Sequence, residues 1–331
     1  MTEASVLSSG HEAFCQLRQR LQQAVLGQAA VIDRMLIALL ADGHLLLEGV
    51  PGLANTRAVK ALAAHLNAGL SGIQFTPDLL PSDITGSDVY LQSGSAGAFR
   101  FDPGPIFSEL VLADEINRAP AKVQSALLEA MEERQVTVGG NTHRLPELFM
   151  VLATQNPIEQ EGTYALPEAQ MDRFVMKVLI DYVDEDTEID ILRTVRRESG
   201  KGFAATVPEM ESVSVACVMA ARDEVQQVFV SPAIERYILN IVCATRKPHG
   251  LGDNLVRWIQ GGASPRGTLA LERCARAHAW LAGRDYVTLD DVRAVLADCL
   301  RHRIIPSYEA LAGGVTVDHM LSVIAGAIAA P

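Results

Sequence analysis

Residues 45–66 read LLLEGVPGLANTRAVKALAAHL. The leucines form a short apolar run that is typical of a buried strand, and residues 57–66 are typical of a helix. The stretch at 49–56 therefore has the strand–loop–helix setting of a phosphate-binding loop. In the pattern G-x-x-x-x-G-K-[ST] only Gly49 and Thr56 match, because Ala54 replaces the second glycine and Asn55 replaces the lysine. The octapeptide alone fits an ordinary strand–helix turn equally well.

Two carboxylates follow a second apolar run. Residues 110–113 read LVLA, and Asp114 and Glu115 come next. Open α/β sheets bind ligands at the carboxyl ends of their strands, where both acids are expected. We predict that Thr56 and Asp114 hold Mg²⁺ together with phosphate oxygens and water, and that Glu115 orients or deprotonates the attacking water. Taken alone, the acidic pair also fits solvated acids that cap the next helix.

Further polar residues follow in order along the chain. The apolar run at 148–153 leads into TQNP, which places Asn156 where it can position the same water. Arg173 and Arg266 each lie at the edge of a predicted helix or turn, and a guanidinium can supply fixed charge to a transferring phosphoryl group. Read singly, Arg173 also fits a surface ion pair, and Arg266 also fits a helix start after Pro265.

Six strings carry a resemblance to a known family, and they occur in that family's order. They are LLLEGVPGLANT, IQFTPDLLPSDITG, GPIFSELVLADEINRAP, QSALLEAMEERQVTV, LATQNPIEQEGTYALPEAQMDRF and GGASPRG. With these strings the chain resembles the MoxR group of AAA+ ATPases from about residue 21 to residue 303. The resemblance implies a P-loop AAA+ core with a parallel sheet and helices on both faces, followed by a small all-α lid.

The same resemblance implies roles for individual residues. Residues 49–56 would be the Walker A loop, Asp114 with Glu115 the Walker B pair, and the segment VLGQ would lie against adenine. The implied catalytic residues are Glu115, Asn156 as sensor 1, Arg173 as arginine finger and Arg266 as sensor 2. The implied ATP-binding residues are Gly27, Gln28, Gly49, Val50, Pro51, Gly52, Leu53, Ala54, Asn55, Thr56, Arg57, Asp114 and Arg266. The core and the lid would clamp ATP and Mg²⁺ between them, and neighbouring subunits would complete each site.

Asn55 departs from the family's pattern. A carboxamide can hydrogen-bond to phosphate, but it supplies neither the charge nor the reach of lysine. Loss of one charge-assisted contact costs about 1.5–3 kcal/mol. We therefore expect an ATP-hydrolysing AAA+ protein with a chaperone-like remodelling role and weakened hydrolysis. The alternative is a nucleotide-binding scaffold that recruits partners without turnover. The resemblance further implies a homo-hexameric ring and a protein client, with a von Willebrand factor A domain protein as a candidate partner.

Composition narrows the class of protein. The 331 residues are 49% hydrophobic, which suffices for a sizeable core, and their net charge of −12 disfavours general nucleic-acid binding. We find no apolar run long enough for a membrane span and no basic secretory start, so we expect a cytoplasmic location. The cysteines stand singly without a C-x-x-C pair, which favours reduced thiols over zinc or disulfides: Cys15, Cys217, Cys243, Cys274 and Cys299.

The pattern of strand-like and helix-like runs divides the chain into two parts. Strand-like and helix-like runs alternate up to about residue 183, and glycines and a proline between 200 and 208 loosen the chain before a helical remainder. We predict a nucleotide-binding core at 1–200 and a helical lid at 201–331. Two hairpins, at 89–101 and 135–145, interrupt the alternation. Both fit plain surface hairpins. Alternatively they face a ring's channel, where His143 and Arg144 would touch a client.

Overall fold

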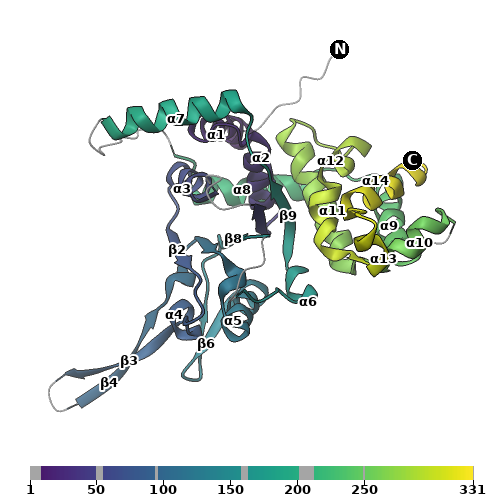
Figure 1. Ribbon diagram of the computed structural model, residues 1–331. Coiled ribbons are helices and arrows are strands. Elements are labelled where there is room, and N and C mark those ends of the chain that lie inside the picture. Colours follow the sequence, from purple (N-terminus) through teal and green to yellow (C-terminus); the bar gives the residue numbers. More distant parts are fainter. Residues whose placement is uncertain are drawn as a thin grey trace.

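The computed structural model describes residues 9–49, 55–93, 96–157, 163–200, 212–248 and 250–330. Figure 1 shows an α/β part, from which a long hairpin projects, beside a helical part that contains the C-terminus. The α/β part is built on a five-stranded sheet whose strands are all parallel. In spatial order its strands are β2 (Leu70–Gln74), β5 (Leu110–Asp114), β8 (Met150–Gln155), β1 (His44–Gly49) and β9 (Phe174–Ile180).

Helices cover both faces of this sheet, as predicted. Leu45 and Leu47 of β1 pack into one buried cluster, and Leu46 between them packs into the other, because successive strand residues point to opposite faces. The first face is covered by α1 (Ser9–Ala24), α2 (Ala29–Leu40) and α3 (Asn55–Leu66). The second face is covered by α4 (Pro81–Thr85) and α5 (Ala121–Glu133), with short 3₁₀ turns at Pro105–Phe107 and Ile116–Arg118.

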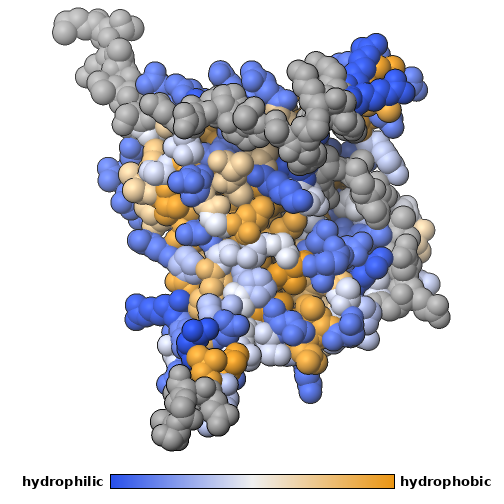
Figure 2. All heavy atoms as spheres, turned by 90° about the vertical axis from the view of Figure 1, so that its left-hand side faces the viewer, coloured by the Kyte–Doolittle hydropathy of each residue, from blue (hydrophilic) through white to orange (hydrophobic). Residues whose placement is uncertain are grey.

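Both predicted hairpins are present. Strands β3 (Gly86–Ser93) and β4 (Ala96–Pro103) form the long ribbon that projects at lower left in Figure 1. Its exposed Phe99 and Tyr90 pack edge to face with ring centroids 5.3 Å apart, and Figure 2 shows apolar residues gathered beside its tip. Strands β6 (Gln135–Val138) and β7 (Asn141–Arg144) form the shorter hairpin. The His143 ring stacks on Phe101 at 3.8 Å, so it joins the two hairpins.

The remaining elements follow the sheet. They are α6 (Glu168–Met171), α7 (Glu185–Gly200), α8 (Val215–Gln227), α9 (Pro232–Arg246), α10 (Asp253–Trp258), β10 (Ile259–Gly261), α11 (Pro265–Leu281), α12 (Leu289–Leu300), a 3₁₀ turn (Arg301–Arg303), β11 (Ile305–Pro306), α13 (Tyr308–Ala312) and α14 (Val317–Ala327). Side chains cap the starts of two lid helices: the Ser231 hydroxyl accepts the Ile234 N–H at 3.3 Å, and Thr288 forms a capping box with Asp291. Within the described ranges, no helix is long and apolar enough to span a bilayer.

The lid is anchored firmly to the sheet. Arg303, whose side chain is only 2% exposed, donates to Asp172 Oδ1 at 2.7 Å and to the Phe174 carbonyl at 2.7 Å. The other oxygen of Asp172 accepts the Ser264 hydroxyl at 2.7 Å. One continuous buried cluster also joins α1 and α2 to the lid helices. These contacts hold the start of α11 against the start of β9.

Candidate functional site

The carboxyl ends of the strands bring several predicted residues to one edge. Gly49 ends β1 and approaches β9 so closely that an added Cβ would lie 2.9 Å from the Ile180 carbonyl oxygen. Residues 50–54 of the loop, and the side chain of Asn55, lie outside the described part of the chain. Thr56 is half-buried in the first turn of α3. The segment that precedes the loop and the helix that follows it therefore have the predicted arrangement.

One hydroxyl organises the two acids that end β5. Thr154 Oγ1, on the adjacent strand β8, donates to Asp114 Oδ1 at 2.6 Å. The same oxygen accepts the Glu115 N–H at 2.8 Å. Asp114 Oδ2 has no hydrogen-bond partner within the described residues, so it can face a hydrated cation. A carboxylate held in this way fits Mg²⁺, which binds few protein oxygens and keeps several waters.

Glu115 lies in a strained turn and is held by two neighbours. Its backbone has φ 57° and ψ 49°, the left-handed region that non-glycine residues seldom occupy and that is common at functional sites. Its Oε2 accepts a hydrogen bond from Gln74 Nε2 at 2.9 Å and lies 3.1 Å from Arg118 Nε. The carboxylate is thus positioned by the ends of β2 and of the 3₁₀ turn beyond β5. Asn156 follows β8 at the same edge, and its carbonyl accepts from Asn117 Nδ2 at 3.4 Å.

The predicted adenine segment lies beside the same edge. Gly27 has φ +76°, and an added Cβ would lie 2.5 Å from a methyl carbon of Val183 and 2.7 Å from that of Thr187. Gln28 is buried at the start of α2. Arg57 is exposed, and its Nε donates to the Ala24 carbonyl at 3.1 Å, so it links α3 to the end of α1. These contacts pack the turn at Gly27 tightly against the segment that follows β9.

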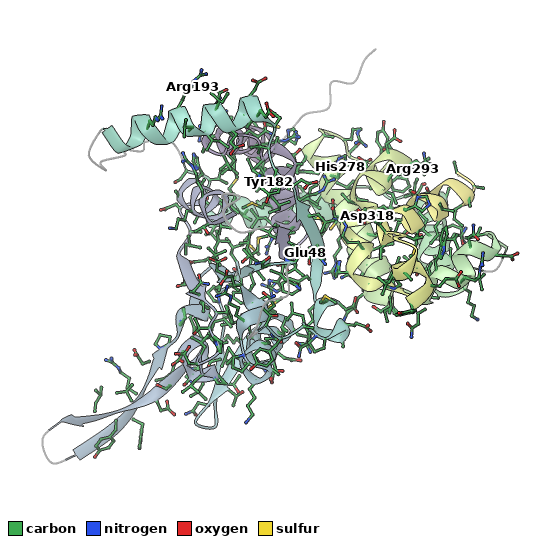
Figure 3. All side chains as sticks on the ribbon, in the orientation of Figure 1. Glu48, Tyr182, Arg193, His278, Arg293 and Asp318 are labelled. Carbon is green, nitrogen blue, oxygen red and sulfur yellow. The ribbon has the colours of Figure 1, made fainter. Side chains whose placement is uncertain are left out.

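A substitute for the missing loop lysine is not evident among the nearby cations. Lys177 on β9 pairs with Glu48 of β1 at 2.8 Å, and each side chain is 17% exposed. Figure 3 shows Glu48 between the sheet and the lid. Because Glu48 already neutralises Lys177, this lysine does not replace the charge absent at Asn55. Lys60 is exposed one turn into α3.

Arg173 and Arg266 lie together at the opposite edge of the sheet. Arg266 Nη2 lies 2.6 Å from Glu132 Oε1, and Arg173 Nε lies 3.8 Å from Glu132 Oε2. Arg173 also donates to the Leu128 carbonyl. It immediately precedes β9, whose first residue pairs with His44 at the start of β1. The strand rise separates this end of β1 from Gly49 by about 16 Å. In this structure Arg266 therefore lies at the edge of the sheet opposite Gly49.

These two arginines line a cavity of about 310 Å³ between the core and the lid. Its charged lining comprises five arginines and three acids: Arg134, Arg173, Arg266, Arg273, Arg303, Asp42, Glu132 and Asp172. His44 contributes to the wall; its Nδ1 accepts the Val151 N–H at 3.0 Å, so its Nε2 carries the proton toward the Met131 carbonyl, 3.3 Å away. Burial, with the nearby Arg134 charge, lowers the His44 pKa to about 4. The imidazole is therefore neutral at pH 7, and the cavity keeps an excess of positive charge.

Several of these residues were not predicted from the sequence. Thr154 and Gln74 are polar residues at strand ends, which is a signal that could have identified them. Glu132 occurs within an ordinary helical run, and nothing in its local sequence indicates that it binds two distant arginines.

Comparisons with known proteins identify the family of the core and of the lid. Residues 44–176 match the ATPase family associated with various cellular activities (AAA), and residues 257–322 match the AAA lid domain. Chaperone MoxR1 of Mycobacterium tuberculosis is 43% identical over 314 residues, which cover 94% of this chain and 80% of that protein. Protein MoxR of Paracoccus denitrificans is 35% identical over 318 residues, covering 92% and 93%. A solved structure from Cytophaga hutchinsonii matches with a TM-score of 0.89 at 44% identity, covering 97% of this chain and 96% of that chain.

The fold and the matched regions define an AAA+ protein, with an α/β nucleotide-binding core and a helical lid. Within that class, the chain belongs to the MoxR family of AAA+ ATPases.

Proposed function

We propose that this protein is a ring-forming, ATP-driven remodelling chaperone whose hydrolysis is weakened by Asn55. The observation that carries the proposal is the Thr154 hydroxyl, which holds Asp114 and the Glu115 backbone in one network. Asp114 and Thr56 would hold Mg²⁺, which neutralises phosphate charge when bound. Glu115 and Asn156 would orient the attacking water. The alternative is a nucleotide-binding scaffold without turnover. It is favoured by Asn55, which supplies no positive charge where the loop pattern has lysine.

A complete site on this proposal needs two copies of the chain. The acids lie at the carboxyl edge of the sheet, whereas Arg173 and Arg266 lie at the amino edge. Neither arginine can therefore reach a phosphate beside the Gly49 of its own chain, while both can face the phosphate of a neighbour. In a head-to-tail ring every interface then pairs one acidic edge with one arginine cavity. The homologue named Chaperone MoxR1 supports the chaperone role, and the −12 net charge supports a protein client rather than nucleic acid.

The test is ATP binding and steady-state hydrolysis by the purified protein with Mg²⁺, beside Asn55→Lys and Asn55→Gln. Asn55→Lys restores a cation at a helix start that already favours anions, so we expect turnover to rise more than about tenfold. Asn55→Gln lengthens the side chain without adding charge and should leave the parent rate nearly unchanged. Saturable binding without turnover in all three proteins would instead establish the scaffold. Equal turnover in the parent and Asn55→Lys would contradict the assigned role of Asn55.

A further inference from the structure

The lid helix α11 exposes an arginine beside a leucine, and the first two turns of α7 expose two glutamates beside an isoleucine and a leucine. We propose that the outward face of α7, formed by Glu185, Glu188, Ile189 and Leu192, packs against Leu269 and Arg273 on α11 of a second copy. The inference rests on the ring of the proposed function, and it identifies the protein surfaces that assemble the ring.

The outward face of α7 is unusually apolar for a surface. Ile189 is 46% exposed and Leu192 is 51% exposed. They lie four and seven residues after Glu185, so the three side chains share one face of the helix, with Glu188 beside them. The exposed Arg196 continues this face one turn beyond Leu192, so the acidic charge belongs to the first two turns of α7. A different face of α7 is turned toward the rest of the protein. Thr187 and Ile191 lie on that face and are half-buried. Within the described residues, neither glutamate has an ion-pair partner. Figure 3 shows Arg193 of this helix directed away from the body.

The complementary face lies on α11. Leu269 is 55% exposed, and Arg273 is exposed four residues later on the same face. Within the described part of the chain, Arg273 is the cavity arginine that no hydrogen bond or ion pair engages. Arg273 also lines a second cavity of about 320 Å³, so it is shared by the two cavities. Leu269 can pack against Ile189 and Leu192, and Arg273 can pair with Glu185 or Glu188. On α7 the charged and the apolar residues lie four positions apart, as Leu269 and Arg273 do on α11.

The positions of the two faces relative to the nucleotide edge agree with this pairing. Helix α7 follows β9 at the carboxyl edge, where Val183 and Thr187 contact Gly27. Arg273 lies seven residues beyond Arg266 on α11, a helical distance of about 10 Å. When one copy directs Arg266 at a phosphate beside a neighbour's Gly49, its Arg273 lies within one helical segment of that site, and the neighbour borders the site with Val183 and with Thr187 of its α7. A second copy of this chain is therefore the occupant that charge and position both favour.

The experiment exchanges charge across the interface. One variant is Arg273→Glu, and the other combines Glu185→Lys with Glu188→Lys. Each alone places like charges opposite each other at every interface. We therefore expect each to weaken subunit association, measured as mass against concentration with ATP and Mg²⁺ present, by about 100-fold. Arg236→Glu makes the same charge change on exposed α9 and should assemble like the parent. Circular dichroism and thermal melting show whether each variant is folded.

Two rescues distinguish this contact from misfolding. In an equimolar mixture, a ring in which the two variants alternate pairs acid with base at every interface. A chain carrying all three substitutions pairs them at every interface without a partner variant. Both should regain parent-like assembly. Recovery in the combined chain alone would still support the contact and would indicate an odd number of subunits. Parent-like assembly of Arg273→Glu, or no recovery in either rescue, would overturn the inference while leaving the ring intact. A parent that stays monomeric at every concentration would overturn both the ring and the contact.

Discussion

Thr154 donates its hydroxyl hydrogen to Asp114 at 2.6 Å while the same oxygen accepts the Glu115 N–H at 2.8 Å. This one side chain therefore orients both the residue assigned to Mg²⁺ and the residue assigned to the attacking water. Because Thr154 is only 6% exposed, water cannot readily replace either hydrogen bond. The strained Glu115 backbone depends on the second of them, since its N–H would otherwise be left unsatisfied.

Thr154→Val tests this dependence with little change of shape. The valine removes both hydrogen bonds, which should cost about 1–3 kcal/mol of unfolding free energy and lower turnover at least about tenfold. Turnover is measured in the Asn55→Lys background and stability by urea unfolding. Thr154→Ser keeps the hydroxyl and should retain most of the activity. Unchanged turnover in Thr154→Val would show that the acids are oriented by other contacts.

The sequence predicted that polar residues would gather at the carboxyl edge of the sheet, because the signals for this placement are local. Each polar residue comes at the end of an apolar run, as Asp114 and Asn156 do, and parallel strands bring such ends together without further information. The two-sided sheet and both hairpins were predictable for the same reason, since their patterns and turns occupy short stretches of chain.

The amino-edge cavity was not predictable in this way. Arg173 and Arg266 are far apart in sequence, and they meet because Asp172 and Arg303 hold the start of α11 against the start of β9. This ion pair depends on how the lid docks, which no local pattern records. A family resemblance supplied the expected roles of the two arginines. Their shared contact with the Glu132 carboxylate is a feature of the tertiary structure alone.

Stability should fall as the pH falls below about 6.5, because His44 is buried in its neutral form. The unfolded histidine binds a proton near its ordinary pKa of 6.5, whereas the folded one binds it only near a pKa of about 4. Between these values the unfolded state holds the extra proton, so the unfolding free energy decreases with falling pH. The full loss from this group is about 3 kcal/mol.

Urea unfolding at several pH values between 7 and 4 measures this dependence. The comparison is with His44→Gln, which stays uncharged and should show a shallower decrease, even if it is less stable at pH 7. Equal pH dependence in the two proteins would mean that His44 is protonated in the folded state as readily as in the unfolded one.

Asp172→Ala should loosen the lid. The substitution leaves the Arg303 guanidinium buried without its carboxylate and removes the acceptor of Ser264, so we expect a loss of about 3 kcal/mol in unfolding free energy. Asp172→Asn retains an acceptor and should cost less. As a control, Asp190→Ala removes the partner of Arg193 in a pair whose side chains are 61% and 67% exposed, and it should cost below about 1 kcal/mol. A loss in Asp172→Ala no larger than in this control would show that the ion pair does not anchor the lid.

The trans placement of the arginines makes the sharpest prediction. Arg173→Ala should leave ATP binding by an isolated subunit nearly intact and abolish hydrolysis in the assembled ring, because the guanidinium acts on a neighbour's phosphate. Arg266→Ala should behave in the same way, since its side chain lies beside Arg173 on Glu132. If Arg266 instead served its own chain's nucleotide, its loss would weaken ATP binding by the isolated subunit.

Mixed rings separate the two edges of the site. Glu115→Gln removes the acid at the carboxyl edge, and either arginine variant removes the cation at the amino edge. When Glu115→Gln is mixed with Arg173→Ala, some interfaces contain an intact Glu115 from one subunit and an intact Arg173 from the next. In the Asn55→Lys background these interfaces should recover part of the hydrolysis, and the mixture with Arg266→Ala should do the same.

A mixture of Arg173→Ala with Arg266→Ala is the control. Both of its residues lie on the same edge of one subunit, so every interface lacks one cation and hydrolysis should stay low. Absence of recovery in rings shown by mass to be mixed would place the arginines in cis or make them structural.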